Sequence, residues 1–252
     1  MKRRLVVLSV ILVLAVLLAG CKGSNKLKVG TSADYPPYEY VDETGKMTGF
    51  DVELMNEIAK RLGVELEWVD MPFDSLVAAV QEGKIDLSIA CFNYSAERDL
   101  EVDFSDAYYS SEDAFIAAGG FTGSFVNPED AANFIVGVQS GTVQDDWLTS
   151  TLVDAGLMSA DNLKRYERVD QAALDLNAGR IDILMADYVP AKAILKQYTG
   201  FQVLYNGELS TGPLNIVLKD GDSELQAKIN AAIKDLLAEG FIDELAVKYF
   251  SD

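Results

Sequence analysis

The stretch that most constrains the fold is residues 84–98, KIDLSIACFNYSAER. Its first half, residues 84–91, alternates apolar and polar side chains and ends in an apolar run, the pattern of a short strand buried in an α/β sheet. Residues 93–95 are turn and cap formers, and they end this strand. The same residues begin a helix whose first turn carries Arg98.

Arg98 is the first candidate site residue, because ligands of open α/β sheets bind beyond the carboxyl ends of the strands. A cation in the first turn of a helix opposes the helix dipole, so an anion is expected beside it. The guanidinium fork suits a carboxylate. A structural ion pair with Asp99 or Glu101 would explain Arg98 equally well, and spacing alone leaves both interpretations open.

A second unit of the chain echoes the first. Gly83-Lys84-Ile85-Asp86 is matched by Gly179-Arg180-Ile181-Asp182, and helical patterns over residues 73–81 and 171–178 precede the two segments. The second echo predicts a strand over residues 180–186 that delivers Asp187 at its end. The pattern therefore predicts two βαβ-like lobes, each with a polar residue at a strand end. Another helix is predicted after Asp51, its expected N-cap, and before Gly63.

Charge and composition exclude several functions. The chain has 40 Asp and Glu against 21 Lys and Arg, for a formal net charge of −19, which argues against nucleic acid and anionic membranes as partners. It contains no histidine, which excludes zinc sites with histidine ligands and Ser-His-Asp triads. We expect no metal and no cofactor. The two cysteines, Cys21 and Cys91, do not read as a disulfide pair.

The N-terminus has the parts of a secretory signal. Basic residues at 2–4 precede an apolar run over 5–18, and the following Leu18-Ala19-Gly20-Cys21 resembles the lipobox of bacterial lipoproteins. We expect a signal peptide over 1–20 and a lipidated tether over 21–26. An uncleaved membrane anchor is the alternative, although the run is shorter than the roughly 20 residues that a spanning helix needs. No later segment is long and apolar enough for a second anchor.

Two loops carry further candidates. Residues 32–40 hold two prolines and several tyrosines, and aromatic rings on a rigid loop can stack against a ligand or simply pack the loop. Residues 140–144 form a turn before a helix, which can offer backbone N–H groups to an anion or be a plain capped turn.

Seven motifs in order carry a family resemblance. They stand at residues 30–40 (GTSADYPPYEY), 49–63 (GFDVELMNEIAKRLG), 71–90 (MPFDSLVAAVQEGKIDLSIA), 95–109 (SAERDLEVDFSDAYY), 136–142 (VGVQSGT), 179–188 (GRIDILMADY) and 240–250 (GFIDELAVKYF). Over residues 27–250 the chain resembles the polar amino-acid-binding proteins of bacterial ABC importers, solute-binding protein family 3.

This resemblance implies a two-lobed α/β periplasmic-binding-protein fold of type II, a "Venus flytrap" with two crossover hinge strands. By analogy, lobe 1 comprises residues 27–110 and 211–252, and lobe 2 comprises residues 111–210. The implied function is that of a monomeric extracytoplasmic lipoprotein. It would capture a free amino acid between its lobes and deliver it to an ABC-transporter permease.

The resemblance also assigns roles to residues. Arg98 corresponds to the clamp for the ligand α-carboxylate, Asp187 to the acceptor of its α-ammonium group, Tyr35 and Phe73 to rings that sandwich its side chain, and Ala90 to a carbonyl that accepts from the ammonium. Further positions of the family's site fall on Ser32, Cys91, Asn93, Gln139, Thr142 and Val143, and Asp34 lies close to Ser32 as a further candidate. This chain departs from the family at several of these positions. Ser32 replaces an acid, Cys91 replaces Gly or Ser, Asn93 replaces Ser or Thr, and Val143 replaces Thr.

Two alternatives to transport stay open on the sequence. A few proteins of this fold are cyclohexadienyl or arogenate dehydratases, which need a buried carboxyl of raised pKa as general acid. The chain could also be the sensing subunit of a signalling complex. The acids Asp34, Glu39 and Asp113 favour a basic amino acid over glutamine as the ligand, because a cationic side chain needs a negative partner.

Overall fold

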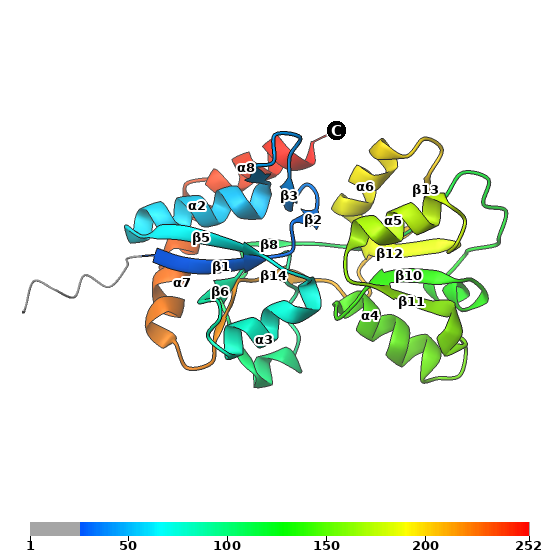
Figure 1. Ribbon diagram of the computed structural model, residues 1–252, viewed down its shortest axis with the longest axis horizontal. Helices are drawn as coiled ribbons and strands as arrows, with labels where there is room; N and C mark the ends of the chain where they lie inside the picture. Colours follow the sequence, from blue (N-terminus) through cyan, green and yellow to red (C-terminus); the bar gives the residue numbers. More distant parts are fainter. Residues whose placement is uncertain (1–25, 252) are drawn as a thin grey trace, which may run out of the picture.

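The structure, a computed structural model, describes residues 26–251 and consists of two lobes, each built on a five-stranded sheet (Figure 1). The strand orders are β5-β1-β6-β15-β7 and β11-β10-β12-β9-β13. The strands of the first sheet are β1 (Lys26–Thr31), β5 (Glu65–Asp70), β6 (Leu87–Ser88), β7 (Val102–Phe104) and β15 (Val217–Lys219). Those of the second are β9 (Asp113–Ala117), β10 (Val136–Gln139), β11 (Leu163–Tyr166), β12 (Ile183–Asp187) and β13 (Gln202–Gly207).

The two sheets repeat one topology. In each, the first three strands run parallel, and the fourth, β15 or β9, is antiparallel to its neighbours. These fourth strands follow the segments that cross between the lobes, β14 (Pro213–Leu214) and β8 (Tyr109–Ser110), which pair with each other. The chain therefore passes between the lobes along two adjacent strands (Figure 1).

Helices bury both faces of each sheet. On the first sheet, α2 (Phe50–Leu62), α7 (Ser223–Ala238) and α8 (Phe241–Phe250) share one core cluster, and α3 (Leu76–Gln81) packs in another. On the second, α5 (Val169–Asn177) and α6 (Tyr188–Gln197) oppose α4 (Val143–Leu148) and the π-helix Thr149–Val153. Along β9, Ala114 and Ile116 pack toward α5 and α6, whereas Phe115 packs with the α4 side, which is the alternation of a strand buried on both faces.

Shorter elements complete the lobes. A three-stranded antiparallel sheet of β2 (Asp34–Tyr35), β3 (Glu39–Val41) and β4 (Met47–Thr48) lies beside α2, and short 3₁₀ helices span Phe73–Ser75, Arg98–Leu100, Pro128–Asn133 and Ala160–Asn162.

Three local predictions need correction. The strand expected over residues 84–91 is only Leu87–Ser88. Residues 84–86 still belong to the bend after α3, where the Lys84 N–H donates to the carbonyl of Ala79 (2.9 Å), and at the other end the backbone turns into the left-handed region at Cys91 (φ 50°). The helix expected to begin at residue 95 is a single 3₁₀ turn, Arg98–Leu100. Asp51 is not an N-cap, since Gly49 occupies that position and Asp51 points into the core instead. The Gly63 end of the helix is confirmed, with Gly63 in the left-handed conformation.

Candidate functional site

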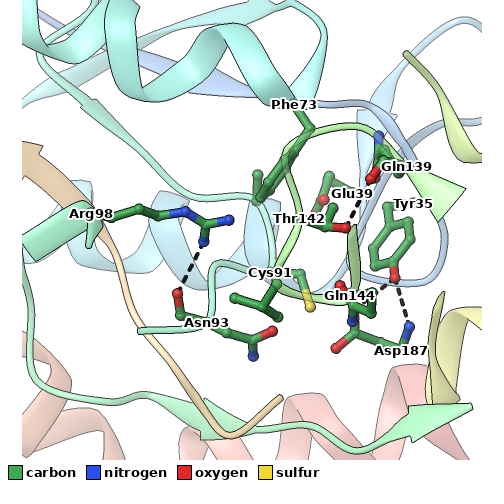
Figure 2. A pocket seen from close by; sticks show the side chains of 12 residues that line it. Tyr35, Glu39, Phe73, Cys91, Asn93, Arg98, Gln139, Thr142, Gln144 and Asp187 are labelled. Atoms are coloured by element: carbon green, nitrogen blue, oxygen red, sulfur yellow. Dashed lines mark hydrogen bonds between the residues drawn. The ribbon is translucent and has the colours of Figure 1, made fainter. Parts of the chain in front are cut away.

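A pocket lies where the two lobes meet, and both lobes contribute to its walls (Figure 2). Its free space is only about 10 Å³, about that of one water molecule, so the two lobes lie closely against each other here. Its walls are formed by Tyr35, Glu39, Phe73, Ala90, Cys91, Asn93, Arg98, Gln139, Thr142, Val143, Gln144 and Asp187. Most of the residues expected from the sequence are therefore brought together, and Glu39 and Gln144 are additions.

Ser32 and Asp34 do not line this pocket. Asp34 accepts hydrogen bonds from the backbone N–H of Val169 (2.6 Å), from Ser32 Oγ (2.6 Å) and from Arg168 Nη1 (3.3 Å). Its carboxylate thus joins the lobes beside the pocket, and Ser32 serves it as a donor. The ligand-binding roles predicted for both residues do not follow from these contacts.

Arg98 reaches the pocket from lobe 1. Its Nη1 donates to the carbonyl of Asn93 (3.2 Å) and its Nη2 to the carbonyl of Gly141 (2.7 Å) in the other lobe. The guanidinium lies over the rings of Phe73 and Phe92, 5.6 and 5.7 Å from their centroids. Burial lowers the pKa of Arg98 from its ordinary value, because the buried cation loses its hydration.

The acids proposed as structural partners of Arg98 are occupied elsewhere. Asp99 accepts a hydrogen bond from the hydroxyl of Tyr94 (3.1 Å), and Glu101 accepts one from the side chain of Gln81 (3.1 Å). The geometry thus favours the interpretation of Arg98 as a pocket residue.

Asp187 reaches the pocket from lobe 2, at the end of β12. Its Oδ2 accepts from Tyr35 OH (2.6 Å) and from Gln144 Nε2 (3.1 Å), while its own N–H donates to the Tyr35 hydroxyl (2.8 Å). Burial raises the pKa of Asp187 to about 6. Its Oδ1 is buried and has no hydrogen-bond partner within residues 26–251, so this carboxylate has room for one more donor.

Tyr35 and Glu39 lie directly opposite each other in the β2–β3 hairpin, which places their side chains on the same face. Tyr35 also connects the two lobes, because its hydroxyl donates to Asp187 of lobe 2. Glu39 is 1% exposed, and burial raises its pKa well above the ordinary value. Glu39 was predicted only to favour a basic ligand and not to line the site, although its spacing from Tyr35 across Pro36-Pro37 was the signal for a hairpin that presents both. Gln144 had no such signal.

The turn at Cys91 is held by Asp51. Oδ2 of Asp51 accepts from the backbone N–H of Cys91 (2.7 Å) and from the hydroxyl of Tyr108 (2.9 Å). Cys91 is the only non-glycine residue among residues 26–251 with a positive φ, a conformation that costs an L-residue about 1–2 kcal/mol. The thiol is free and buried, as predicted.

Several remaining candidates have structural partners. The amide of Asn93 donates to Ser111 Oγ (3.1 Å), directly after the crossover strand β8, so a ligand would compete with Ser111 for this donor. Thr142 caps α4 by accepting from the N–H of Asp145 (3.2 Å), which matches the plain capped turn. Gln139 donates to the carbonyl of Glu167 (3.3 Å).

Asp113 does not line the pocket, which corrects its use as an argument for a basic ligand. No group of three or more His, Cys, Asp and Glu residues that could hold a metal occurs within residues 26–251. In the same range, no helix has the length and apolarity needed to cross a bilayer. Cys21 and the predicted signal peptide lie outside the described residues.

The fold and the site together define a class, the two-lobed binding proteins that hold a small solute between lobes joined by crossover strands. Residues 27–252 match the profile of the bacterial extracellular solute-binding proteins, family 3, and the chain belongs to this family.

Named relatives agree with this assignment. The L-arginine-binding protein of Pseudomonas aeruginosa is 32% identical over 233 residues, which is 89% of this chain and 88% of that protein. An ancestral arginine-binding protein bound to arginine superposes with a TM-score of 0.83 at 35% identity, covering 90% of this chain and 99% of that one. An ancestral arginine-binding protein bound to glutamine superposes with a TM-score of 0.81, also at 35% identity and with the same coverage. The type II periplasmic-binding-protein fold is thereby confirmed.

Proposed function

We propose that this protein is an extracytoplasmic receptor that captures a polar, basic L-amino acid between its lobes and delivers it to an ABC importer. One observation carries the proposal. Arg98 and Asp187 reach one small pocket from opposite lobes, and Asp187 keeps an oxygen without a partner among the described residues. A zwitterion complements this pair, because its carboxylate suits the guanidinium and its ammonium suits the carboxylate.

The preference for a basic side chain rests on Glu39 and on the relatives. Glu39 is the further acid in the pocket wall, where its Oε2 has no hydrogen-bond partner within the described chain. A cationic side chain would supply both the charge and the donor.

The experiment is a thermal-shift screen against the twenty amino acids. A ligand at 100 times its dissociation constant stabilises the protein by about 2.7 kcal/mol, which gives a clear rise in melting temperature. We expect arginine and lysine to give the largest shifts, with glutamine weaker. A screen in which no amino acid raises the melting temperature would contradict the proposed function.

The proposal has two further parts. Residues 27–110 and 211–252 form lobe 1 and residues 111–210 form lobe 2, and the lobes close by hinging at residues 110–112 and 209–212. Small-angle scattering should then show compaction when ligand is added. Residues 1–20 are a signal peptide and Cys21 carries the lipid anchor, so mass spectrometry of membrane-extracted protein should show acylated Cys21 as the N-terminus.

The dehydratase alternative is not favoured, because the matched relatives are named as binding proteins. Incubation with prephenate or arogenate should yield no aromatic product.

A further inference from the structure

A cluster of buried acids lies at one wall of the pocket. Glu39 on β3 and Asp51 on α2 interact with each other, and the two residues are 1% and 0% exposed. Oε2 of Glu39 and Oδ1 of Asp51 find no hydrogen-bond donor within residues 26–251. A proton held between two carboxyl groups supplies such a donor, so the pair needs one proton to satisfy both acids.

The other groups around Glu39 offer no positive charge in its place. Asp51, Asp34 and Asp187 are the charged groups that act on Glu39 most strongly, and all three disfavour its ionisation. The Cys91 N–H and the Tyr108 hydroxyl donate to Asp51, and Asp51 raises the pKa of the Cys91 thiol and of the Tyr38 hydroxyl.

Arg98 in the pocket wall and Arg168 beside the pocket both face other partners. Arg98 donates to the carbonyls of Asn93 and Gly141, and Arg168 donates to Asp34 and Asp70. Two ionised carboxylates in this enclosure would therefore repel each other without compensation.

We propose that Glu39 and Asp51 share one proton, which a cationic ligand side chain replaces, so that binding a basic amino acid releases one proton to solvent and binding a neutral one does not. The proposal rests on the proposed function and deepens it. Charge balances in the step: one positive side chain enters, one proton leaves the Glu39 carboxyl for the buffer, and the net charge of the pocket stays the same.

The direction of the titration agrees with this scheme. Burial raises the pKa of Asp51 to about 7 and that of Glu39 well above its ordinary value, and the hydrogen bond from Glu39 lowers the pKa of Asp51. Glu39 is thus the member that holds the proton near neutral pH. A cation beside Glu39 favours its ionised form and expels the proton. The same pocket then accepts a neutral ligand with Glu39 protonated and a cationic ligand with Glu39 ionised.

The test is calorimetry of the full chain with L-arginine and L-citrulline at pH 7.5, in phosphate and in Tris, whose heats of ionisation differ. Citrulline carries a neutral ureido group in place of the guanidinium. Protons released from the α-ammonium group of each ligand, or from Asp187, contribute equally to the proton release measured with arginine and with citrulline. These contributions therefore cancel when the two ligands are compared. We expect arginine to release about one proton more than citrulline, and its affinity to rise up to tenfold more per pH unit. Equal proton release by the two ligands would overturn the proposal.

A matched pair of variants locates the proton. Glu39→Gln keeps a donor toward Asp51 and cannot ionise, so it should lose the extra proton release and weaken arginine binding at least tenfold more than citrulline binding. Glu43→Gln changes the same charge on an exposed turn and should behave as the parent. Extra proton release that persists in Glu39→Gln would assign the proton elsewhere and overturn the proposal.

The wild-type calorimetry decides the matter without any variant. Arginine binding with no extra proton release overturns only this inference. Failure of the parent protein to bind any amino acid overturns the proposed function, and the inference with it.

Discussion

Asp113 fixes the segment that returns the chain from lobe 2 to lobe 1. Its carboxylate, at the start of β9, accepts from the consecutive backbone N–H groups of Leu209, Ser210 and Thr211 at 3.0, 2.7 and 3.0 Å. The hydroxyls of Ser210 and Thr211 donate to it as well, at 2.9 and 3.0 Å. Asp113 itself is 0% exposed. One side chain thus holds the approach to β14.

Replacing Asp113 with Ala should destabilise the protein severely. The change leaves three half-buried N–H groups without their acceptor, and each lost acceptor costs about 1–3 kcal/mol, at the low end where water reaches the group. We expect a loss of about 3–5 kcal/mol in the free energy of unfolding, a large share of the roughly 5–15 kcal/mol of a natural domain. At about 2–4 °C per kcal/mol, the melting temperature should fall by about 10 °C.

Urea denaturation measures the loss, with Asp182→Ala as the matched control. Asp182 is exposed and accepts one backbone bond, from the N–H of Ile135 (2.8 Å), so its removal should cost only about 0.5–1.5 kcal/mol. Asp113→Ala should keep the parent's ratio of arginine to citrulline affinity. If this variant instead matched the stability of the control and lost the preference for arginine, Asp113 would be a ligand residue and the structural reasoning would be wrong.

Four shorter predictions concern residues of the pocket. Phe73→Ala should weaken ligand binding by about 1–3 kcal/mol, since the ring packs 4.5 Å from that of Phe92 beneath Arg98, whereas an affinity within twofold of the parent would mean that the ring only packs the wall. Citrulline affinity should fall as the pH drops through about 6, because protonated Asp187 no longer attracts the ammonium, and a flat profile would argue against Asp187 as its acceptor. Native Asp187 holds its proton more tightly than the unfolded chain does, so its contribution to stability should increase as the pH falls from about 6 to 4. The buried Cys91 thiol should react with a thiol reagent only on unfolding, and rapid labelling of the native protein would contradict its burial.

The periodicity of apolar residues predicted the larger helices and strands. It failed where contacts with residues distant in the sequence determine where an element ends. The helix ending at Gly63 and the strand leading to Asp187 follow from local patterns that tertiary packing reinforces. The apolar run after Ser88 looked like more strand, but its end is set by Asp51, which captures the N–H of Cys91 from 40 residues away. No window of local sequence contains that contact.

The candidate site was predictable to the extent that family positions fix it. Arg98 and Asp187 follow strands whose ends converge, so their meeting in one pocket could be expected. Asp34 could not be placed in this way. It is close to the site residues in the sequence, but its carboxylate accepts hydrogen bonds from Val169 and Arg168 of the other lobe instead of lining the pocket. Gln144 reaches Asp187 only because α4 begins at Val143, a boundary that composition does not specify.

The central claim is that Arg98 and Asp187 recognise the two ends of an α-amino acid, and calorimetry with L-arginine, its α-amide and its des-amino analogue tests it most directly. Neutralising either residue should weaken L-arginine binding by about 2–5 kcal/mol, mainly by leaving the opposite charge of the ligand unpaired. Arg98→Ala should no longer distinguish arginine from its α-amide, and Asp187→Asn should no longer distinguish arginine from the des-amino analogue. If Arg98→Ala instead kept the parent's full preference for the free carboxylate, the clamp would lie elsewhere and the account would be contradicted.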